Sequence, residues 1–272
     1  MKQKIAFIGA GKMASAIVRG LIKKSVYTAD SILCTCGNDS TGLDLAQETG
    51  IGYVESLLPH YSEIDTLVLA CKPQQLDKID LSAWTEEADS SSKISLISIL
   101  AGTTLHDLEA RFPFAMNIIR TMPNTPGQIG MGSTAYASLK PLDNAEQDRI
   151  ETILGALGSV YAVNESAIDA ITALSGSGPA YVFEFISALI ESGVQAGLEE
   201  KLAQSLAQET VLGSAELLRT SSLSAEELRN AVTSPGGTTE AALEVLNKSG
   251  FKALIHSAVL RAKERSIELA QN

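Results

Sequence analysis

Residues 5–14 read IAFIGAGKMA, and this stretch decides the fold of the first half of the chain. Its first four residues form an apolar run that predicts a short strand, and residues 13–23 show a helical pattern. Between them stands the motif Gly9-x-Gly11-x-x-Ala14. In such a strand–turn–helix the first glycine permits the tight turn, the second lets a pyrophosphate approach the backbone, and the small third residue allows close helix–strand packing. The motif in this context predicts dinucleotide binding.

Strand and helix patterns alternate along the rest of the first half. The run 66–70 is continuously apolar, as expected of a parallel strand that helices cover on both faces. Repeated βα units of this kind predict a doubly wound, mostly parallel sheet with right-handed crossovers. We therefore predict an α/β Rossmann domain over residues 1–164. Its further predicted strands are 32–35, 94–99, 115–119, 134–137 and 160–163, and its further predicted helices are 43–48 and 145–157.

The pattern changes near Asn164, and residues 165–272 are predicted to be all helical. Between residues 168 and 190 the only charged residues are Asp169 and Glu184. A helix that is apolar nearly all round needs burial on every side, and a domain of about 100 residues has little interior to offer. We predict a homodimer formed through this half, with a compact monomeric bundle as the alternative. The predicted helices are 179–196, 202–218, one after the capping box Ser224-x-x-Glu227, 239–248 and 251–270.

Composition and charge restrict the partners. Hydrophobic residues make up 45% and charged residues 19% of the chain, as in soluble globular proteins, and the formal net charge is −11. This acidity argues against broad nucleic-acid binding and against attachment to acidic lipid. An anionic ligand must therefore meet local positive groups, for which Lys12, Lys72 and Arg120 are candidates. We find no secretion signal, and glycines and Pro179 interrupt the longest apolar stretch, so we expect a cytoplasmic protein without a membrane span.

The three cysteines predict a reducing compartment and no metal site. An odd, sparse set is typical of proteins without disulfides. Cys34 and Cys36 are expected to point to one face of a strand, but further ligands are missing because the three histidines are scattered. We interpret both thiols as small buried side chains.

The end of the second predicted strand normally selects the coenzyme, because an acid there binds the ribose 2′-hydroxyl and disfavours a 2′-phosphate. Here that segment, residues 34–40, reads CTCGNDS, with no acid at its tip and no arginine after it. Asn38, Ser40 and Thr41 could hydrogen-bond a 2′-phosphate, whereas Asp39 would oppose it. We predict NADPH as the coenzyme and keep NADH open.

Two further loops follow predicted strands, at the sheet edge where open α/β folds bind their ligands. In the first, Lys72 faces either the coenzyme or solvent. The second, residues 120–126, holds two prolines and is stiff enough to support a nicotinamide or to serve as a rigid connection only. The candidate coenzyme-binding residues are Gly9, Ala10, Gly11, Lys12, Met13, Asn38, Ala70, Lys72, Pro73 and Asn124.

Residues 234–239, SPGGTT, form a second candidate anion site. Two adjacent glycines and two hydroxyls at a helix start make a cluster of backbone N–H donors that could hold a carboxylate or phosphate. The alternative is an ordinary glycine-rich turn. One anion site in each half suggests a dinucleotide and a small anionic substrate. The candidate substrate-binding residues are Ser234, Gly236, Gly237, Thr238 and Thr239.

No lysine lies near residues 175–178 to act as a strong acid, which favours an imine over a ketone as the substrate, because a protonated imine accepts hydride without oxyanion stabilisation.

The chain resembles the pyrroline-5-carboxylate reductases over essentially its whole length. The resemblance lies in residues 9–14, 71–74, 101–102, 122–126, 172–181 and 232–239. It implies a Rossmann domain, an all-α dimerisation domain and often a ring of dimers. It also implies hydride transfer from NAD(P)H to the imine carbon of (S)-1-pyrroline-5-carboxylate, giving L-proline in the last step of proline biosynthesis.

The resemblance also implies roles for single residues. It places the substrate carboxylate on residues 234–239, across a dimer interface from the coenzyme, and makes Thr239 the hydroxyl donor to the substrate, with help to proton delivery at nitrogen. Many relatives carry arginine or a serine-rich turn where this chain has residues 36–39, so the coenzyme preference stays open. The alternatives are a reductase of another cyclic imine, such as a six-membered one, and a reductase-like protein that only senses a dinucleotide.

Overall fold

The computed structural model describes residues 4–37, 39–79, 82–87 and 93–270. The chain forms two compact units, which we describe separately. Unit 1 comprises residues 1–177 and 262–272, and unit 2 comprises residues 178–261.

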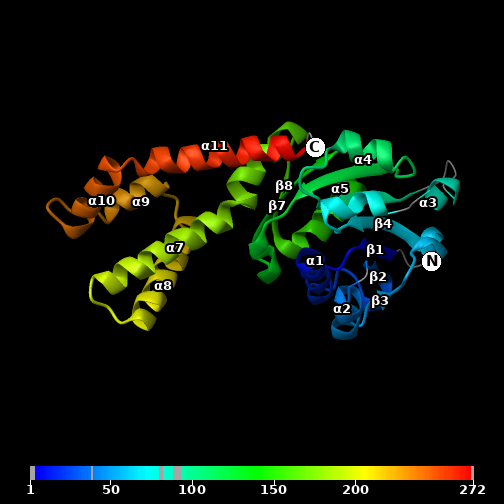
Figure 1. Ribbon diagram of the computed structural model, residues 1–272, viewed down its shortest axis with the longest axis horizontal. Helices are drawn as coiled ribbons and strands as arrows, with labels where there is room; N and C mark the ends of the chain where they lie inside the picture. Colours follow the sequence, from blue (N-terminus) through cyan, green and yellow to red (C-terminus); the bar gives the residue numbers. More distant parts are fainter. Residues whose placement is uncertain (1–3, 38, 80–81, 88–92, 271–272) are drawn as a thin grey trace. The chain divides into compact units, whose positions relative to one another are not determined.

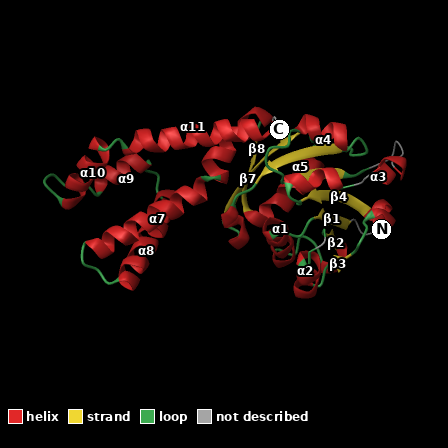
Figure 2. Ribbon diagram, in the orientation of Figure 1, coloured by secondary structure: helices red, strands yellow, loops and turns green. Residues whose placement is uncertain are grey.

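Unit 1 is built on an eight-stranded sheet with the order β3-β2-β1-β4-β5-β6-β7-β8 (Figures 1 and 2). All neighbouring strands are parallel except β6 and β7, which pair antiparallel. The first six strands have the order typical of dinucleotide-binding domains, so the predicted doubly wound, mostly parallel sheet is confirmed. The strands are β1 (Lys4–Ile8), β2 (Ile32–Thr35), β3 (Gly52–Tyr53), β4 (Ile64–Leu69), β5 (Ser95–Ser98), β6 (Asn117–Met122), β7 (Gly132–Ser138) and β8 (Gly158–Ala162).

Two apolar clusters, one on each face of the sheet, form the core of unit 1. The alternation along β1 divides it between them, because Ile5 and Phe7 belong to one cluster and Ala6 and Ile8 to the other. Helices α1 and α5 contribute to the first cluster and α4 to the second. The helices are α1 (Lys12–Lys23), α2 (Thr41–Thr49), α3 (Ser82–Glu87), α4 (Leu105–Arg111), α5 (Asn144–Leu154) and α6 (Ile168–Ile171), and a π-helical turn, Thr172–Gly176, follows α6.

The cysteines of unit 1 are free. Cys34 is buried in β2 and Cys36 lies just past the strand end, and both thiols donate to backbone oxygens of the β2–α2 region, those of Gly42 and Asp39. Burial raises the pKa of Cys34 to about 11, which keeps this thiol protonated at neutral pH.

Unit 2 is helical, as predicted. Its helices are α7 (Gly178–Gln195), α8 (Glu200–Thr220), α9 (Ala225–Ala231), α10 (Thr238–Lys248) and α11 (Phe251–Ala270), the last of which continues into unit 1. The predicted capping box is present, because Glu227 N–H donates to Ser224 Oγ and Ser224 N–H donates to Glu227 Oε2. Among the described residues, one helical segment, Glu165–Gln195, is long and apolar enough to cross a membrane by length and composition alone, properties that packing helices of soluble proteins share.

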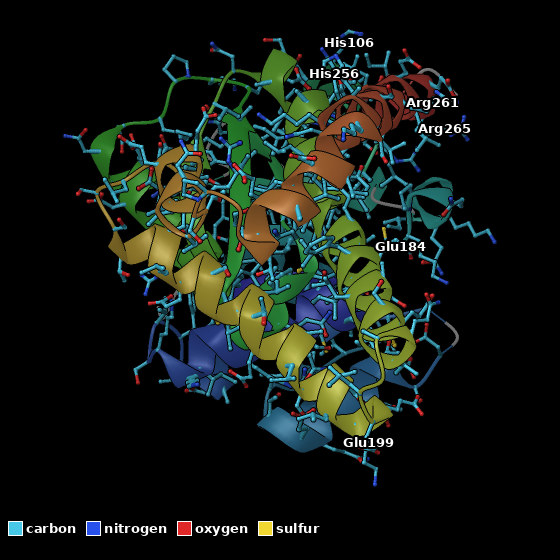
Figure 3. The ribbon with its side chains drawn as sticks, turned by 90° about the vertical axis from the view of Figure 1, so that its left-hand side faces the viewer. His106, Glu184, Glu199, His256, Arg261 and Arg265 are labelled. Atoms are coloured by element: carbon cyan, nitrogen blue, oxygen red, sulfur yellow. The ribbon has the colours of Figure 1, made fainter. Side chains whose placement is uncertain are left out.

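Unit 2 has almost no interior of its own. Of residues 178–261, all of which the structure describes, only Ala203 and Ala207 are buried. Large apolar side chains are exposed on each long helix of the unit, including Phe183 at 65% and Leu254 at 67%. Figure 3 shows the side chains on these helices and labels Glu184, the residue that follows Phe183 in the sequence.

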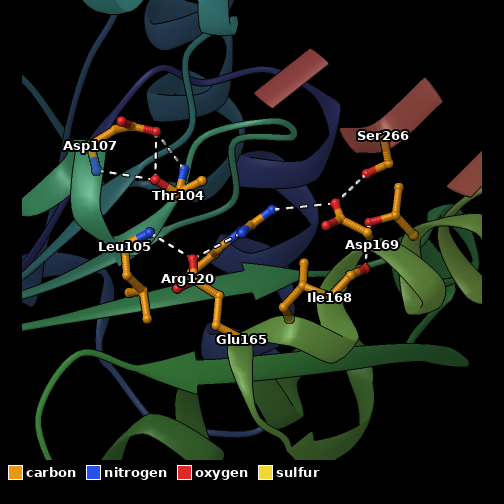
Figure 4. Close-up of polar contacts among 9 residues, drawn as sticks. Thr104, Leu105, Asp107, Arg120, Glu165, Ile168, Asp169 and Ser266 are labelled. Carbon is orange, nitrogen blue, oxygen red and sulfur yellow. Dashed lines mark hydrogen bonds and ion pairs between the residues drawn. The ribbon is translucent and has the colours of Figure 1, made fainter. Parts of the chain in front are cut away.

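An ion network around the buried Arg120 holds β6 to the segment after β8 (Figure 4). Arg120 is only 4% exposed, and its Nη1 lies 2.9 Å from Glu165 Oε1. Its Nη2 lies 3.9 Å from Asp169 Oδ1, which also accepts a 2.7 Å hydrogen bond from Ser266 Oγ on α11. This corrects the sequence-based candidate, because two carboxylates already engage the cation that we considered available to an anionic ligand.

We expect Arg120→Ala to destabilise unit 1 by about 3–5 kcal/mol, because it leaves the partly buried Glu165 and Asp169 without their cation. Urea unfolding followed by the fluorescence of Trp84, the single tryptophan, measures this at fixed protein concentration. Arg219→Ala is the control, because Arg219 pairs with Glu216 at an exposed site and its loss should leave the free energy of unfolding nearly unchanged. Equal losses in the two variants would contradict the structural role of Arg120.

Candidate coenzyme and substrate sites

A cavity of about 790 Å³ opens at the carboxyl ends of β1, β2 and β4. The strand order reverses at β1, because β2 and β3 lie on one side of β1 in the sheet and β4 lies on the other. Open α/β sheets bind their ligands at the point where the strand order reverses. The lining residues are Ile8, Gly9, Ala10, Gly11, Thr35, Cys36, Gly37, Asp39, Thr41, Glu55, Ser56, Leu57, Ala70, Cys71, Lys72, Gln75, Lys78, Ile79 and Trp84.

Glycine is needed for a different structural reason at each of the two positions of the first motif. Gly9 has φ +100°, and a Cβ there would lie 2.6 Å from the carbonyl carbon and oxygen of Ala70. Its N–H donates to Thr35 O at 2.8 Å, so it connects the ends of β1 and β2. Gly11 caps the start of α1, and apart from its chain neighbours and its own helix no described atom lies within 4 Å of a Cβ built there. The backbone at the α1 N-terminus is therefore open to a ligand, and its free amides and the helix dipole favour an anion.

The cavity wall carries charges of both signs. Lys72 and Lys78 supply positive charge, and Asp39 and Glu55 supply negative charge. Lys72 lies on the wall as the residue before the 3₁₀ helix Pro73–Lys78, and its backbone N–H donates to Gln75 Oε1 at 3.1 Å. The structure therefore places Lys72 beside the glycine motif, in the same cavity.

Asp39 is already held by the helix that follows it. Its Oδ1 accepts from the N–H of Thr41 at 3.0 Å and from the Thr41 hydroxyl at 2.5 Å. The Thr41 hydroxyl is the main reason that the pKa of Asp39 lies below its usual value. Asp39 is therefore a carboxylate with one oxygen committed to the first residue of α2. Asn38 lies outside the described residues, between Gly37 and Asp39 of the cavity wall.

Four sequence-predicted residues are not part of this wall. Lys12 is exposed at the start of α1, Met13 packs on the core of unit 1, and Pro73 is exposed at the start of its 3₁₀ helix. Asn124 Oδ1 accepts from Ser133 N–H at 2.9 Å, and Asn124 Nδ2 donates to Ser175 O at 3.3 Å. Asn124 thus connects the β6–β7 loop to the π-helical turn.

Sequence reasoning missed several residues of the wall, among them Gln75, Lys78 and Trp84. Lys78 and Gln75 reach the cavity because residues 73–78 form a 3₁₀ helix, which no periodic pattern indicates. Trp84 comes from α3, where its ring packs 5.2 Å from Tyr61. The sequence held one signal for this residue, which is that Trp84 is the single tryptophan of the chain.

In unit 2, the SPGGTT segment forms a tight turn that leads into α10. Gly236 has φ +73°, a conformation that favours glycine, and Gly237 is the residue before the first helical position. Gly236 N–H donates to Glu240 Oε2 at 2.7 Å, and Gly237 N–H donates to Ser234 O at 3.0 Å. The two glycine amides that we considered as anion donors are thus engaged within the turn.

The next two residues have the open donors. The first backbone hydrogen bond of α10 is donated by Ala241 N–H to Gly237 O. The amides of Thr238 and Thr239 lie before this bond, so they have no acceptor within the helix. The structure shows no hydrogen bond from the amide or hydroxyl of either threonine to another described residue. Four donors and the positive end of the α10 dipole therefore lie within two consecutive residues. Such a cluster suits a carboxylate.

Within the described part of the chain, no group of three or more His, Cys, Asp or Glu side chains is placed to hold a metal ion. The donors described above are backbone amides, hydroxyls and lysines. They suit organic anions better than a cation.

Comparison with known proteins identifies the chain. Residues 4–102 match the family described as NADP oxidoreductase, coenzyme F420-dependent, and residues 165–269 match the family described as pyrroline-5-carboxylate reductase dimerisation. With the cavity at the sheet edge, the matches define an NAD(P)H-dependent oxidoreductase. The pyrroline-5-carboxylate reductase of Synechocystis sp. is 40% identical over the full length of both chains. The chain belongs to the pyrroline-5-carboxylate reductase family, as its motifs predicted.

Solved structures agree in fold over the whole chain. A pyrroline-5-carboxylate reductase from Coxiella burnetii has a TM-score of 0.90 at 35% identity and covers 100% of both chains. The Plasmodium falciparum pyrroline carboxylate reductase with NADP bound has a TM-score of 0.83 at 30% identity and covers 98% of both chains. The predicted fold class, a Rossmann domain followed by a helical dimerisation domain, is thereby confirmed.

Proposed function

We propose that this chain reduces (S)-1-pyrroline-5-carboxylate to L-proline, the last step of proline biosynthesis, with the SPGGTT turn as the anchor of the substrate carboxylate. The observation that carries the residue assignment is the pair Thr238–Thr239, whose amides and hydroxyls have no partner among the described residues at the start of α10. Ser234, Gly236 and Gly237 give the turn its shape. Residues 1–164 would then bind the coenzyme, and residues 165–272 would bind substrate and form the dimer.

The chemistry asks little of the protein beyond binding and orientation. The reduced nicotinamide supplies the hydride when it is bound. A cyclic imine is basic enough to be protonated in solution, so its carbon accepts hydride without a strong acid from the protein. Anchoring the carboxylate fixes the ring, and orientation of this kind can contribute several kcal/mol to the rate. Thr239 is the second residue of α10. Its hydroxyl is our candidate for the hydrogen bond to the substrate and for assisting proton delivery to the substrate nitrogen.

We propose NADPH as the preferred coenzyme. Lys72 and Lys78 on the cavity wall would attract a 2′-phosphate. Asp39, which would oppose it, has one oxygen engaged by Thr41, and this reduces its capacity to accept from a ribose hydroxyl. The glycine motif with Ala10 and the α1 N-terminus, including Lys12 and Met13, would bind the pyrophosphate. Asn38, Ala70, Pro73 and Asn124 remain our candidates for further coenzyme contacts.

We propose that the chain is a homodimer, and the exposed apolar surface of unit 2 supports this. A stable unit needs a buried core, but only two alanines of residues 178–261 are buried. A second copy would cover the exposed side chains of α7, α8 and α11. A ring of dimers and a cytoplasmic location stay predictions. The absence of nucleic-acid or membrane partners also stays a prediction, which the net charge of −11 supports.

The direct test of the function is the loss of absorbance at 340 nm after adding pyrroline-5-carboxylate to protein and NADPH. The fluorescence of Trp84, which lines the cavity, reports coenzyme binding separately, by energy transfer to the reduced nicotinamide. Tight coenzyme binding without turnover on either coenzyme would favour a dinucleotide sensor. Turnover of a six-membered cyclic imine in preference to pyrroline-5-carboxylate would reassign the substrate.

We expect Thr239→Ala to raise KM for pyrroline-5-carboxylate and to lower kcat/KM by about 10- to 100-fold, because it removes a hydroxyl hydrogen bond to a charged group. Coenzyme affinity, measured by Trp84 fluorescence, should not change. The control is Thr210→Ala, since the Thr210 hydroxyl donates to Leu206 O within α8 and is not part of the turn. An unchanged kcat/KM in Thr239→Ala would remove this threonine from the mechanism.

We expect Lys78→Gln to lower the ratio of kcat/KM with NADPH to kcat/KM with NADH by about three- to tenfold, because only NADPH carries the 2′-phosphate that the ammonium group attracts. Parallel kinetics with both coenzymes measure the ratio. Lys23→Gln, at the exposed end of α1, is the control for the loss of one positive charge. An equal loss with both coenzymes would assign Lys78 a role other than phosphate recognition.

We expect Phe183→Asp and Leu254→Asp each to convert the dimer into monomers of reduced helix content, because each places a carboxylate in the surface that a second copy would cover. Light scattering after size-exclusion chromatography measures the mass, and far-ultraviolet circular dichroism measures the helix content. Glu184→Gln, the neighbour of Phe183, is the control and should stay dimeric. A monomeric wild-type protein would refute the proposal.

A further inference from the structure

The turn that we assign to the substrate already contains a carboxylate. Glu240 is the third residue of α10, and its Oε2 accepts the 2.7 Å hydrogen bond from Gly236 N–H. The side chain therefore folds back over the start of its own helix. The partner amide belongs to the same glycine pair that the sequence marked as anion donors.

Two physical effects stabilise Glu240 in this place. A hydrogen bond between an amide and an ionised carboxylate is stronger than a neutral one. A negative charge in the first turn of a helix also interacts favourably with the helix dipole. The Glu240 side chain is only partly exposed, and no cation is within ion-pair distance of it among the described residues. Its stabilisation therefore comes from the turn itself.

The substrate anchor has the same chemistry as this side chain. The proposed ligand of the turn is a carboxylate, and it would meet the amides of Thr238 and Thr239, which directly precede Glu240 in the sequence. The Glu240 carboxylate, held on the Gly236 amide, and a substrate carboxylate on the Thr238 and Thr239 amides would repel each other and would share the positive end of the same helix dipole. Binding of one therefore weakens binding of the other.

We propose that Glu240 is an internal competitor for the substrate-carboxylate site, which occupies the Gly236 amide in the free protein and leaves it when substrate binds. The inference rests on the proposed function of the SPGGTT turn. It makes Glu240 a residue that sets substrate affinity, acting through the turn and not on the reacting atoms. Substrate must displace a bound carboxylate before it gains the full set of donors, so KM lies above the value that the turn alone would give.

The experiment removes the carboxylate in two ways. Glu240→Gln keeps the length of the side chain and an acceptor oxygen but loses the charge, and Glu240→Ala frees the Gly236 amide altogether. Both should lower KM for pyrroline-5-carboxylate, by about three- to tenfold at low ionic strength, with kcat changed less than twofold. The inhibition constant of cyclopentanecarboxylate, a ring acid without the imine, should fall by a similar factor, and the difference from wild type should shrink as salt rises.

The matched control is Glu244→Gln. Glu244 lies one turn further along α10 and pairs with Lys248 at 3.3 Å, so this variant changes the charge of the helix by the same amount away from the turn. Its KM and inhibition constant should stay within twofold of wild type. Thermal unfolding of all three variants, measured at one protein concentration, separates a change in affinity from a change in stability.

The outcomes distinguish the two proposals. If Thr239→Ala raises KM and the inhibition constant while both Glu240 variants match or exceed wild-type values, the anchor stands and the competitor is refuted. If none of the variants in the turn changes either constant, the turn is not the carboxylate site and the proposed substrate anchor fails, whereas absence of turnover in the wild-type protein would refute the proposed reaction itself. A fall in both constants that Glu244→Gln reproduces would attribute the effect to net helix charge and overturn the inference.

Discussion

The coenzyme cavity depends on one close approach between two backbone segments. Gly9, at the end of β1, passes so near to Ala70 and Cys71, at the end of β4, that a Cβ would clash at 2.6–2.7 Å. This contact lies between the neighbouring strands β1 and β4, at the point where the strand order of the sheet reverses. Because Gly9 also bonds to Thr35 at the end of β2, one residue fixes three strand ends around the opening of α1. A side chain there would separate the strands that define the cavity.

Helix starts supply the positive ends that this acidic chain has few side chains to provide. The two lysines of the cavity wall are matched by Asp39 and Glu55, so the described side chains of the wall carry no excess positive charge. The amides and dipole of α1 therefore contribute the fixed positive potential for a dinucleotide. The same device recurs at α10 in unit 2, where Thr238 and Thr239 have open donors. A protein of charge −11 can thus bind anions locally without a basic surface.

Sequence reasoning predicted the elements whose signal is local and missed those set by distant partners. The strands β1 and β2 follow from apolar runs beside glycines, β4 follows from a continuous apolar run, and the capping box of α9 follows from four residues. The two-residue strand β3 has no such signal, because it exists only through pairing with β2. Arg120 looked like a ligand-binding cation because its partner Glu165 lies 45 positions away. Such pairings are fixed by the tertiary fold, and the periodicity of one segment cannot show them.

The SPGGTT turn shows the same limit at the level of a single motif. The sequence indicated the cluster of donors, but only the structure distinguishes the amides used inside the turn from those left open. Gly236 and Gly237 are engaged by Glu240 and Ser234, respectively. The glycines are needed for the shape of the turn, because Gly236 adopts φ +73°, while the donors that are open in the free protein belong to the threonines that follow. An anion site at a helix start thus needs residues that bend the chain and others that keep free donors, and consecutive residues of one motif divide the two tasks.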